Sequence, residues 1–333
     1  MDLARNLADA ARNFTTPARV PERTARLRTD QHVPDGIRRI ARGHLQDARD
    51  ELDGVPSRRL GTAVHATRKR LKRLRACVRL SRDAIGEGTY ERENTTLRMA
   101  GRRISAQRDA QVLVETLDAL SERFAEELPK DATAALRKRL EQDLKAAAAS
   151  LGEGNGDGPI AATRTAIDEA LARTPTWAFE QDGFGAISPG LRRIYRRGRR
   201  AMRAARVEPT AEHLHEWRKR VKDLWYATEI VRPARPKQLK RVARRAHKLS
   251  SLLGDHHDLH VLRAFVVSNP QCFDDETHRQ ALLAVIDRRA AHLCQKALAR
   301  GRKLYKPKPK RFVREIERGW RKRAVATPKP QAG

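Results

Sequence analysis

The stretch VHATRKRLKRLRACVRL, residues 64–80, carries seven Lys or Arg side chains and one His in seventeen positions, without a carboxylate. At about 100° per residue its apolar residues Val64, Leu71, Leu74 and Val78 form one stripe, which predicts an amphipathic helix packed on a core. Its like-charged neighbours three or four positions apart cost the helix roughly 1–3 kcal/mol in total. A bound polyanion would turn this repulsion into attraction.

The charged side chains of this helix divide into two sets. Arg70 and Arg73 point away from the apolar stripe, so we expect them on an outward face that tolerates substitution. The set beside the stripe, which we expect to be half-buried, comprises His65, Arg68, Lys72, Arg75 and Arg79.

The pattern recurs in the second half of the chain. GIRRIARG (36–43) resembles GLRRIYRRG (190–198), VHATRKRLKRL (64–74) resembles LHEWRKRVKDL (214–224), and RDAQVL (108–113) resembles HDLHVL (257–262). The three matches keep their order along the chain, so we infer two homologous helical halves. The predicted boundaries are a basic N-terminal arm (1–30), a first half (31–150), a linker region (151–185), a second half (186–305) and an extended basic tail (306–333).

The second copy retains the charged flank and changes the outer face. His215, Arg218 and Lys222 occupy the positions of His65, Arg68 and Lys72, whereas Asp223 replaces Arg73 and can pair with Lys219. Because only the flank is retained in both copies, we interpret the flank as functional.

The composition favours an all-α protein with a polyanionic partner. Helical periodicity extends from about residue 35 to 305, and strand-like alternation is nowhere sustained. The 71 Lys and Arg exceed the 41 Asp and Glu by 30 charges, which favours nucleic acid, an anionic membrane or a phosphate polymer. The plain alternative is a basic surface that only aids solubility.

The compartment is predicted from the cysteines and from the absence of targeting segments. The three cysteines are odd in number and lack C-x-x-C spacing, so we expect reduced thiols in a protein core. We find no leader and no stretch of about 20 apolar residues, and we therefore expect a cytoplasmic protein that does not enter a membrane.

These motifs resemble those of the CHAD domain family, the conserved-histidine α-helical domain. The resemblance is carried by VHATRKRLKRLR (64–75) and LHEWRKRVKDL, each with His-x-x-Arg-x-x-x-Lys, and by AQRDAQVL (106–113) and KLSSLLGDHHDLHVL (248–262). It covers about residues 33–305. It implies two pseudo-symmetric antiparallel four-helix bundles around a basic central cavity, non-enzymatic binding of inorganic polyphosphate and, for some members, association with polyphosphate granules.

The resemblance also implies a set of phosphate ligands. Carried over by position, they are His65, Arg68, Lys72 and Arg75 in the first half and His215, Arg218 and Lys222 in the second. Trp225 stands where the second copy should have the counterpart of Arg75, so we expect the halves to contribute unequally. To these ligands we add other cations of the basic runs, namely Lys69, Arg79, Lys219, Arg38, Arg42, Arg192, Arg196, Arg98, Arg244 and Lys248.

Two other functions are compatible with parts of the sequence, metal-dependent phosphate hydrolysis and nucleic-acid binding. In DHHDLH (255–260), His256 and His260 are four residues apart and can share a helix face, as in a metal-dependent phosphohydrolase. The first copy reads AQRDAQ there, so we expect no metal, no other cofactor and no catalysis, and we expect Asp109 and Asp258 to start or brace helices. The alternative partner is nucleic acid, bound nonspecifically, although aromatic residues make up only 5% of the chain.

Overall fold

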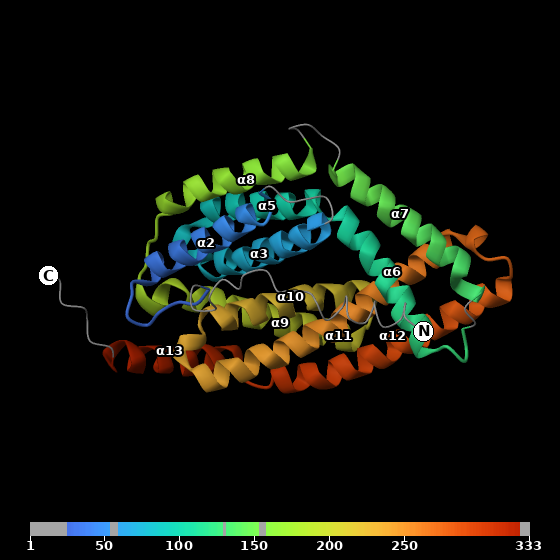
Figure 1. The fold of residues 1–333 in the computed structure, drawn as a ribbon. Helices are drawn as coiled ribbons and strands as arrows, with labels where there is room; N and C mark the ends of the chain where they lie inside the picture. The colour runs from blue at the N-terminus through green and yellow to red at the C-terminus, as the bar shows by residue number, and fades with distance from the viewer. Residues whose placement is uncertain (1–24, 54–58, 129–130, 153–157, 327–333) are drawn as a thin grey trace, which may run out of the picture.

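The computed structural model describes residues 25–53, 59–128, 131–152 and 158–326. These segments contain twelve α-helices and no strand, which confirms the all-α prediction (Figure 1). Most of the predicted N-terminal arm lies outside the described residues. The helices are α2 (Val33–Asp50), α3 (Leu60–Leu80), α4 (Arg82–Ile85), α5 (Glu87–Arg103), α6 (Ala106–Arg123), α7 (Ala134–Gly152), α8 (Pro159–Arg173), α9 (Ser188–Val207), α10 (Ala211–Ile230), α11 (Pro236–Ser268), α12 (Glu276–Leu304) and α13 (Pro309–Ala326).

Local sequence signals set several helix ends. Proline occupies one of the first two positions of α2, α8, α9 and α11, where its missing N–H costs no helical hydrogen bond. The side chains of Thr210 and Asp275 accept hydrogen bonds from the first turns of α10 and α12. The two helices that carry the duplicated motif, α3 and α10, are thus formed as predicted.

The helices pack in two groups. In the first group α2 packs against α3 and α8, and α5 packs against the same two helices; in the second, α10 packs against α9 and α11, and α12 packs against α11 and α9. Helices α3 and α10 also contact one another, so the two copies of the motif meet where the groups join (Figure 1).

One hydrophobic core runs through both groups. The apolar stripe of α3, including Leu71 and Leu74, is buried in the same cluster as Val221 and Leu224 of α10. The close approach of α9 to the end of α3 requires a glycine at position 190, because a Cβ there would lie 1.9 Å from the carbonyl oxygen of Leu80. The halves defined by the sequence repeat therefore share a core.

Helices α6 and α7 depart from a simple division into halves. They belong to the first half of the sequence, but their leucines form a second core with the end of α11 and with α12 (Figure 1). The position of α6 matters for the site, because its first turn lies beside α3 and α11.

Two predicted irregular segments contain helices. The region 151–185 includes α8, whose Ala166, Ile167 and Ala170 are buried because they share an apolar face. The tail predicted for 306–333 includes α13, which packs against α9 and buries Phe312, Val313, Ile316 and Trp320. The prediction of an extended tail was wrong up to Ala326 because basic residues and prolines obscured this apolar periodicity; residues 327–333 lie outside the described part.

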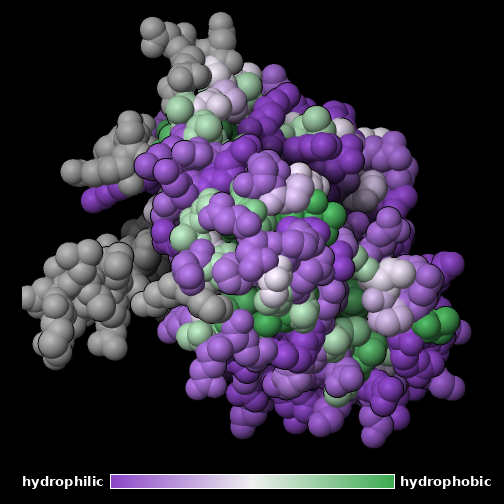
Figure 2. All heavy atoms as spheres, turned by 90° about the vertical axis from the view of Figure 1, so that its right-hand side faces the viewer, coloured by the Kyte–Doolittle hydropathy of each residue, from purple (hydrophilic) through white to green (hydrophobic). Residues whose placement is uncertain are grey.

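The described surface offers no broad apolar face on the end shown in Figure 2, where small hydrophobic areas are separated by hydrophilic side chains. None of the helices in the described ranges combines the length and apolarity that crossing a membrane requires. The three cysteines carry free thiols, and Cys77 and Cys272 are buried as predicted.

Candidate anion-binding site

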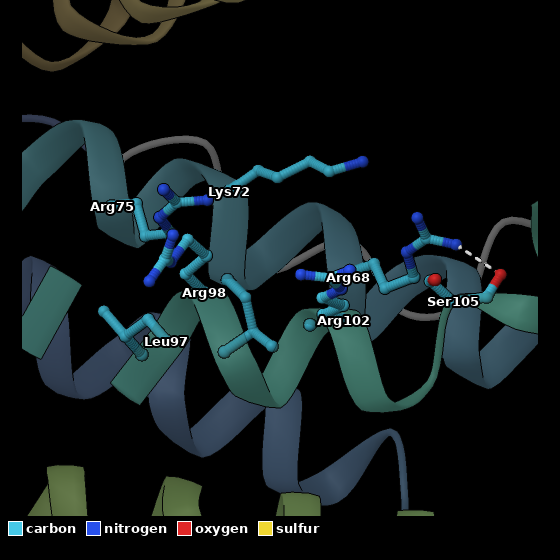
Figure 3. A pocket seen from close by; sticks show the side chains of 9 residues that line it. Arg68, Lys72, Arg75, Leu97, Arg98, Arg102 and Ser105 are labelled. Atoms are coloured by element: carbon cyan, nitrogen blue, oxygen red, sulfur yellow. Dashed lines mark hydrogen bonds between the residues drawn. The ribbon is translucent and has the colours of Figure 1, made fainter. Parts of the chain in front are cut away.

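A cationic cavity lies between α3 and α5. Its volume is about 200 Å³, and Arg68, Lys72, Arg75, Arg98 and Arg102 line it together with apolar residues and Ser105 (Figure 3). No carboxylate is among the lining residues. The cavity thus presents five positive charges to a space that holds roughly seven water molecules, at ~30 Å³ each.

Arg68 is positioned by the break between α5 and α6. Ser105 immediately precedes α6, and its backbone carbonyl accepts two hydrogen bonds of 3.0 Å, one from the backbone N–H of Asp109 and one from Nη1 of Arg68. The other terminal nitrogen of Arg68 lies 3.2 Å from Oδ1 of Asp109. These contacts fix the guanidinium at one end of the cavity.

Arg75 forms the other end. Its Nε donates to Oδ1 of Asn94 at 3.1 Å, which orients the guanidinium toward α5. Burial, followed by repulsion from Arg79, lowers the pKa of Arg75 to about 10, and Arg98 adds to this repulsion. Arg75 and Arg98 point into the same region in Figure 3, so neutral Asn94 holds the cluster without cancelling its charge.

The positive charge continues from α3 onto α10. Lys72 is in contact with solvent but lies in a concave region, and this partial burial together with Arg68 and Arg218 lowers its pKa to about 8. Burial, Arg218 and Lys72 lower the pKa of Lys222 to about 7. The Arg and Lys of both copies are therefore close enough to repel one another across the α3–α10 junction.

The duplicated aspartates lie beside these cations. Asp109 attracts Lys72, and Asp258 attracts Lys222, each attraction opposing the lowering of the lysine pKa. Burial raises the pKa of Asp258, because the charged carboxylate is less stable away from water than the protonated acid. The pairing of Asp109 with Arg68 shows that this residue orients a site cation, a role beyond the helix bracing that was predicted.

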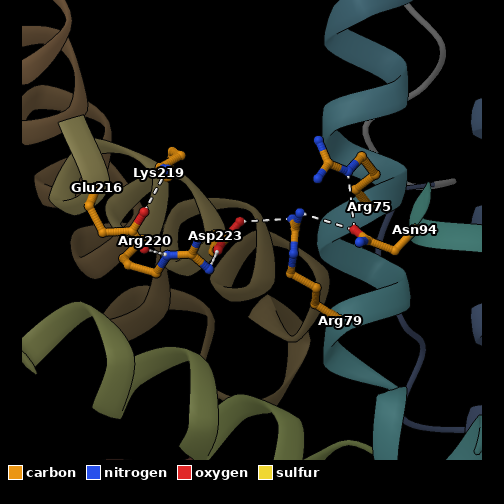
Figure 4. A network of polar contacts seen from close by, with 7 residues as sticks. All are labelled: Arg75, Arg79, Asn94, Glu216, Lys219, Arg220 and Asp223. Carbon is orange, nitrogen blue, oxygen red and sulfur yellow. Dashed lines mark hydrogen bonds and ion pairs between the residues drawn. The ribbon is translucent and has the colours of Figure 1, made fainter. Parts of the chain in front are cut away.

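A second arginine cluster shows what a compensated site looks like. Arg79, Arg82, Arg193, Arg197 and Arg220 surround a space of only about 10 Å³. Arg79 and Arg220 both bind Asp223, at 2.9 and 3.0 Å (Figure 4). Arg82 binds Glu87, and Arg193 binds Asp83. Internal carboxylates thus pair with four of the five arginines of this cluster, whereas the lining of the α3–α5 cavity includes no carboxylate.

Two predictions about the outer faces were wrong. Arg70 lies 3.2 Å from Asp47 of α2 and its side chain is only 15% exposed, because α2 covers the face that was expected to be outward. Asp223 is buried and binds Arg79 and Arg220, whereas Lys219 pairs with Glu216 at 2.5 Å. Covering helices, which a helical-wheel argument cannot anticipate, convert these positions into structural ion pairs.

The predicted histidines lie on the same two helices but outside the cavity lining. His65 is exposed, and burial of part of its ring together with Arg108 and Lys69 lowers its pKa. The ring of His215 lies 4.2 Å from that of His257, between centroids, and burial followed by Lys219 lowers its pKa. In the ranges that the structure describes, no three His, Cys, Asp or Glu residues are grouped so that they could hold a metal ion.

Trp225 changes the second copy of the site. Its ring packs 4.2 Å from the ring of His247 of α11 and 4.8 Å from that of Tyr226. These rings occupy the part of the second copy where the first copy has Arg75. Trp225 supplies no cation at this position, and unequal binding by the two halves stays a prediction.

The remaining predicted residues do not line the cavity. Arg38 donates to Asp35 and to the backbone carbonyl of Trp177, and Arg79 and Lys219 are ion-paired as described above. Lys69 lies close enough to lower the pKa of His247. Exposed positions on α2, α9 and α11 are taken by Arg42, Arg192, Arg196, Arg244 and Lys248.

Two lining residues, Arg102 and Ser105, were not predicted from the sequence. Arg102 lies one helical turn after Arg98, so its spacing gave a signal that could have been used. The role of Ser105 depends on its backbone carbonyl, which accepts a bond from Arg68 besides the helical bond from Asp109, and no side-chain pattern signals that.

Comparison with known families gives one match. Residues 39–267 match the family described as the CHAD domain. The matched segment includes α3, α5, α10 and most of α11. No curated protein matches the chain.

Proposed function

The chain belongs to the CHAD domain family, and from this membership we propose that it binds inorganic polyphosphate without catalysis. The family is associated with polyphosphate binding. The observation that carries the proposal is the α3–α5 cavity, in which five cations face a shared space without a lining carboxylate. Arginine forks and the lysine ammonium are the groups that proteins use to bind phosphate oxygens.

The proposed path of the polymer runs from this cavity across α3 to α10. Arg218 and Lys222 of α10 supply the next positive charges. They repel Arg68 and Lys72 of α3, and phosphates bound between the two helices would reduce this repulsion. We propose that the two groups of helices are pseudo-symmetric four-helix bundles enclosing this basic region. The matched spacing of the His, Arg and Lys residues in both copies supports this arrangement. Location in the cytoplasm, on polyphosphate granules, is part of the proposal.

The test is a calorimetric titration with polyphosphate of defined length. Wild-type protein should bind it, and Arg102→Ala should weaken binding about tenfold because one charge-assisted contact is lost. Arg103→Ala is the matched control, since the neighbouring Arg103 is exposed and does not line the cavity. The polymer should keep its length during incubation. No binding, or equal displacement by DNA of matched charge, would contradict the proposal.

The affinity should depend on pH through Lys72 and Lys222. Their pKa values in the free protein are about 8 and about 7, and a bound polyanion favours the protonated form of each. Binding should therefore be tightest below about pH 7 and weaken by roughly tenfold or more as pH rises to about 9. Titrations across this range measure the effect.

The control is Lys72→Arg combined with Lys222→Arg. Arginine remains charged throughout this range, so the decline above pH 7 should largely disappear while binding is retained. Titration of the polymer itself is common to both proteins. A decline of the same size in the double variant would show that the two lysines are not its source.

A further inference from the structure

A second basic concavity lies at the turn between α12 and α13, outside the residues matched to the family. Its volume is about 1020 Å³, and its lining includes Lys306, Lys308, Lys310, Arg311 and Arg314. One acid, Glu315, also lines it and binds Nε of Arg311 at 3.0 Å. Four lining cations, the three lysines and Arg314, therefore have no ion pair within the lining that the structure describes.

The turn is held firmly on α9. The hydroxyl of Tyr195 lies 3.1 Å from the carbonyl oxygen of Pro307 and 3.3 Å from that of Leu304, and its ring stacks on Phe312 with centroids 4.2 Å apart. Tyr305 is also buried. The lysines are thus carried on a fixed backbone, which reduces the entropy that a partner's binding must overcome.

We infer that this turn binds the phosphate backbone of double-stranded DNA without sequence specificity. A concave surface with exposed cations fits the convex phosphate ridge of a duplex. The positive charge continues beyond it on the exposed side of α13, at Arg318, one turn after Arg314. At 1.5 Å per residue, the 18-residue α13 spans about 27 Å, the length of roughly eight base pairs.

The burial of the aromatic residues argues against other polyanions. Phe312 and Trp320 are 4% and 5% exposed, so they offer neither a stacking platform for single-stranded bases nor an anchor for a bilayer. The concavity is also about five times larger than the α3–α5 cavity and is formed by one turn, so it does not surround a narrow phosphate chain. This inference does not depend on polyphosphate binding at the central site.

The experiment measures binding of a short fluorescent DNA duplex by anisotropy at several salt concentrations. If four cations contact phosphates, the slope of log affinity against log salt is about −3.6, a loss of roughly 150-fold between 50 and 200 mM salt. The triple variant Lys306→Ala/Lys308→Ala/Lys310→Ala should have a slope of about −0.9. Its affinity for the duplex should therefore fall only roughly fourfold between 50 and 200 mM salt. The triple variant should keep its polyphosphate affinity.

The matched control combines Lys138→Ala, Lys145→Ala and Lys296→Ala, three exposed lysines on α7 and α12. It removes the same charge and should retain the wild-type slope. Loss of DNA binding in Arg68→Ala/Lys72→Ala but not in the turn variant would overturn the inference, because DNA would then occupy the central site. Equal loss in the control triple variant, or preference for anionic vesicles over the duplex, would overturn it as well.

Discussion

Replacing Arg68 and Lys72 together with Ala should lower the affinity for polyphosphate by at least about 100-fold. Each substitution removes a charge-assisted contact worth roughly 1.5–3 kcal/mol, and both side chains line the same cavity. The loss should be specific to binding. Removing Arg68 leaves Asp109 largely exposed to solvent, with a side chain 62% accessible, and removing Lys72 relieves repulsion from Arg218. Calorimetry measures the affinity, and chemical denaturation measures the stability.

The matched control is Lys296→Ala with Arg300→Ala. These residues are an exposed Lys and Arg four positions apart on α12, so the control removes the same charge with the same spacing from a helix that does not line the cavity. It should change the affinity by no more than about twofold, through the general field of the protein. Similar losses in both double variants would show that binding follows net charge and not the cavity.

Replacing Asp223 with Ala should lower the free energy of unfolding by about 3 kcal/mol. Asp223 is 8% exposed and is the shared partner of Arg79 from α3 and Arg220 from its own helix (Figure 4). Removing one member of a buried ion pair leaves the other charges uncompensated, which typically costs 3–5 kcal/mol. Asn94 and Glu216 still contact the two arginines, so we expect the lower end of that range. Urea denaturation with a two-state fit measures the change.

A surface ion pair provides the comparison for Asp223. Asp287 accepts a 2.7 Å hydrogen bond from Arg263, but their side chains are 54% and 42% exposed. Asp287→Ala should therefore cost less than about 1 kcal/mol. If both variants lost the same stability, the Asp223 network would contribute no more than an ordinary surface pair.

Much of the central site was predictable because helical periodicity places residues relative to a core. Arg68, Lys72 and Arg75 were assigned to one flank of α3 from their spacing, and all three line the cavity. Arg98, on α5, was predicted only as an additional cation, and Arg102 was missed although it follows one turn later. Arg70 was placed correctly on the side of α3 away from the apolar stripe. It is nevertheless buried, because α2 covers that side, and helical periodicity does not predict which helix packs there.

The sequence by itself determined the all-α class, the helices that carry the duplicated His, Arg and Lys pattern, and the excess of positive charge. Each of these follows from the order of residues along one helix or from their number. Only the tertiary structure decided which charges are compensated: it brought Asp223 to Arg79, Asp47 to Arg70 and no carboxylate to the lining of the α3–α5 cavity. The physical reason is that an ion pair depends on distances between segments far apart in the chain, and those distances are set by how the helices pack.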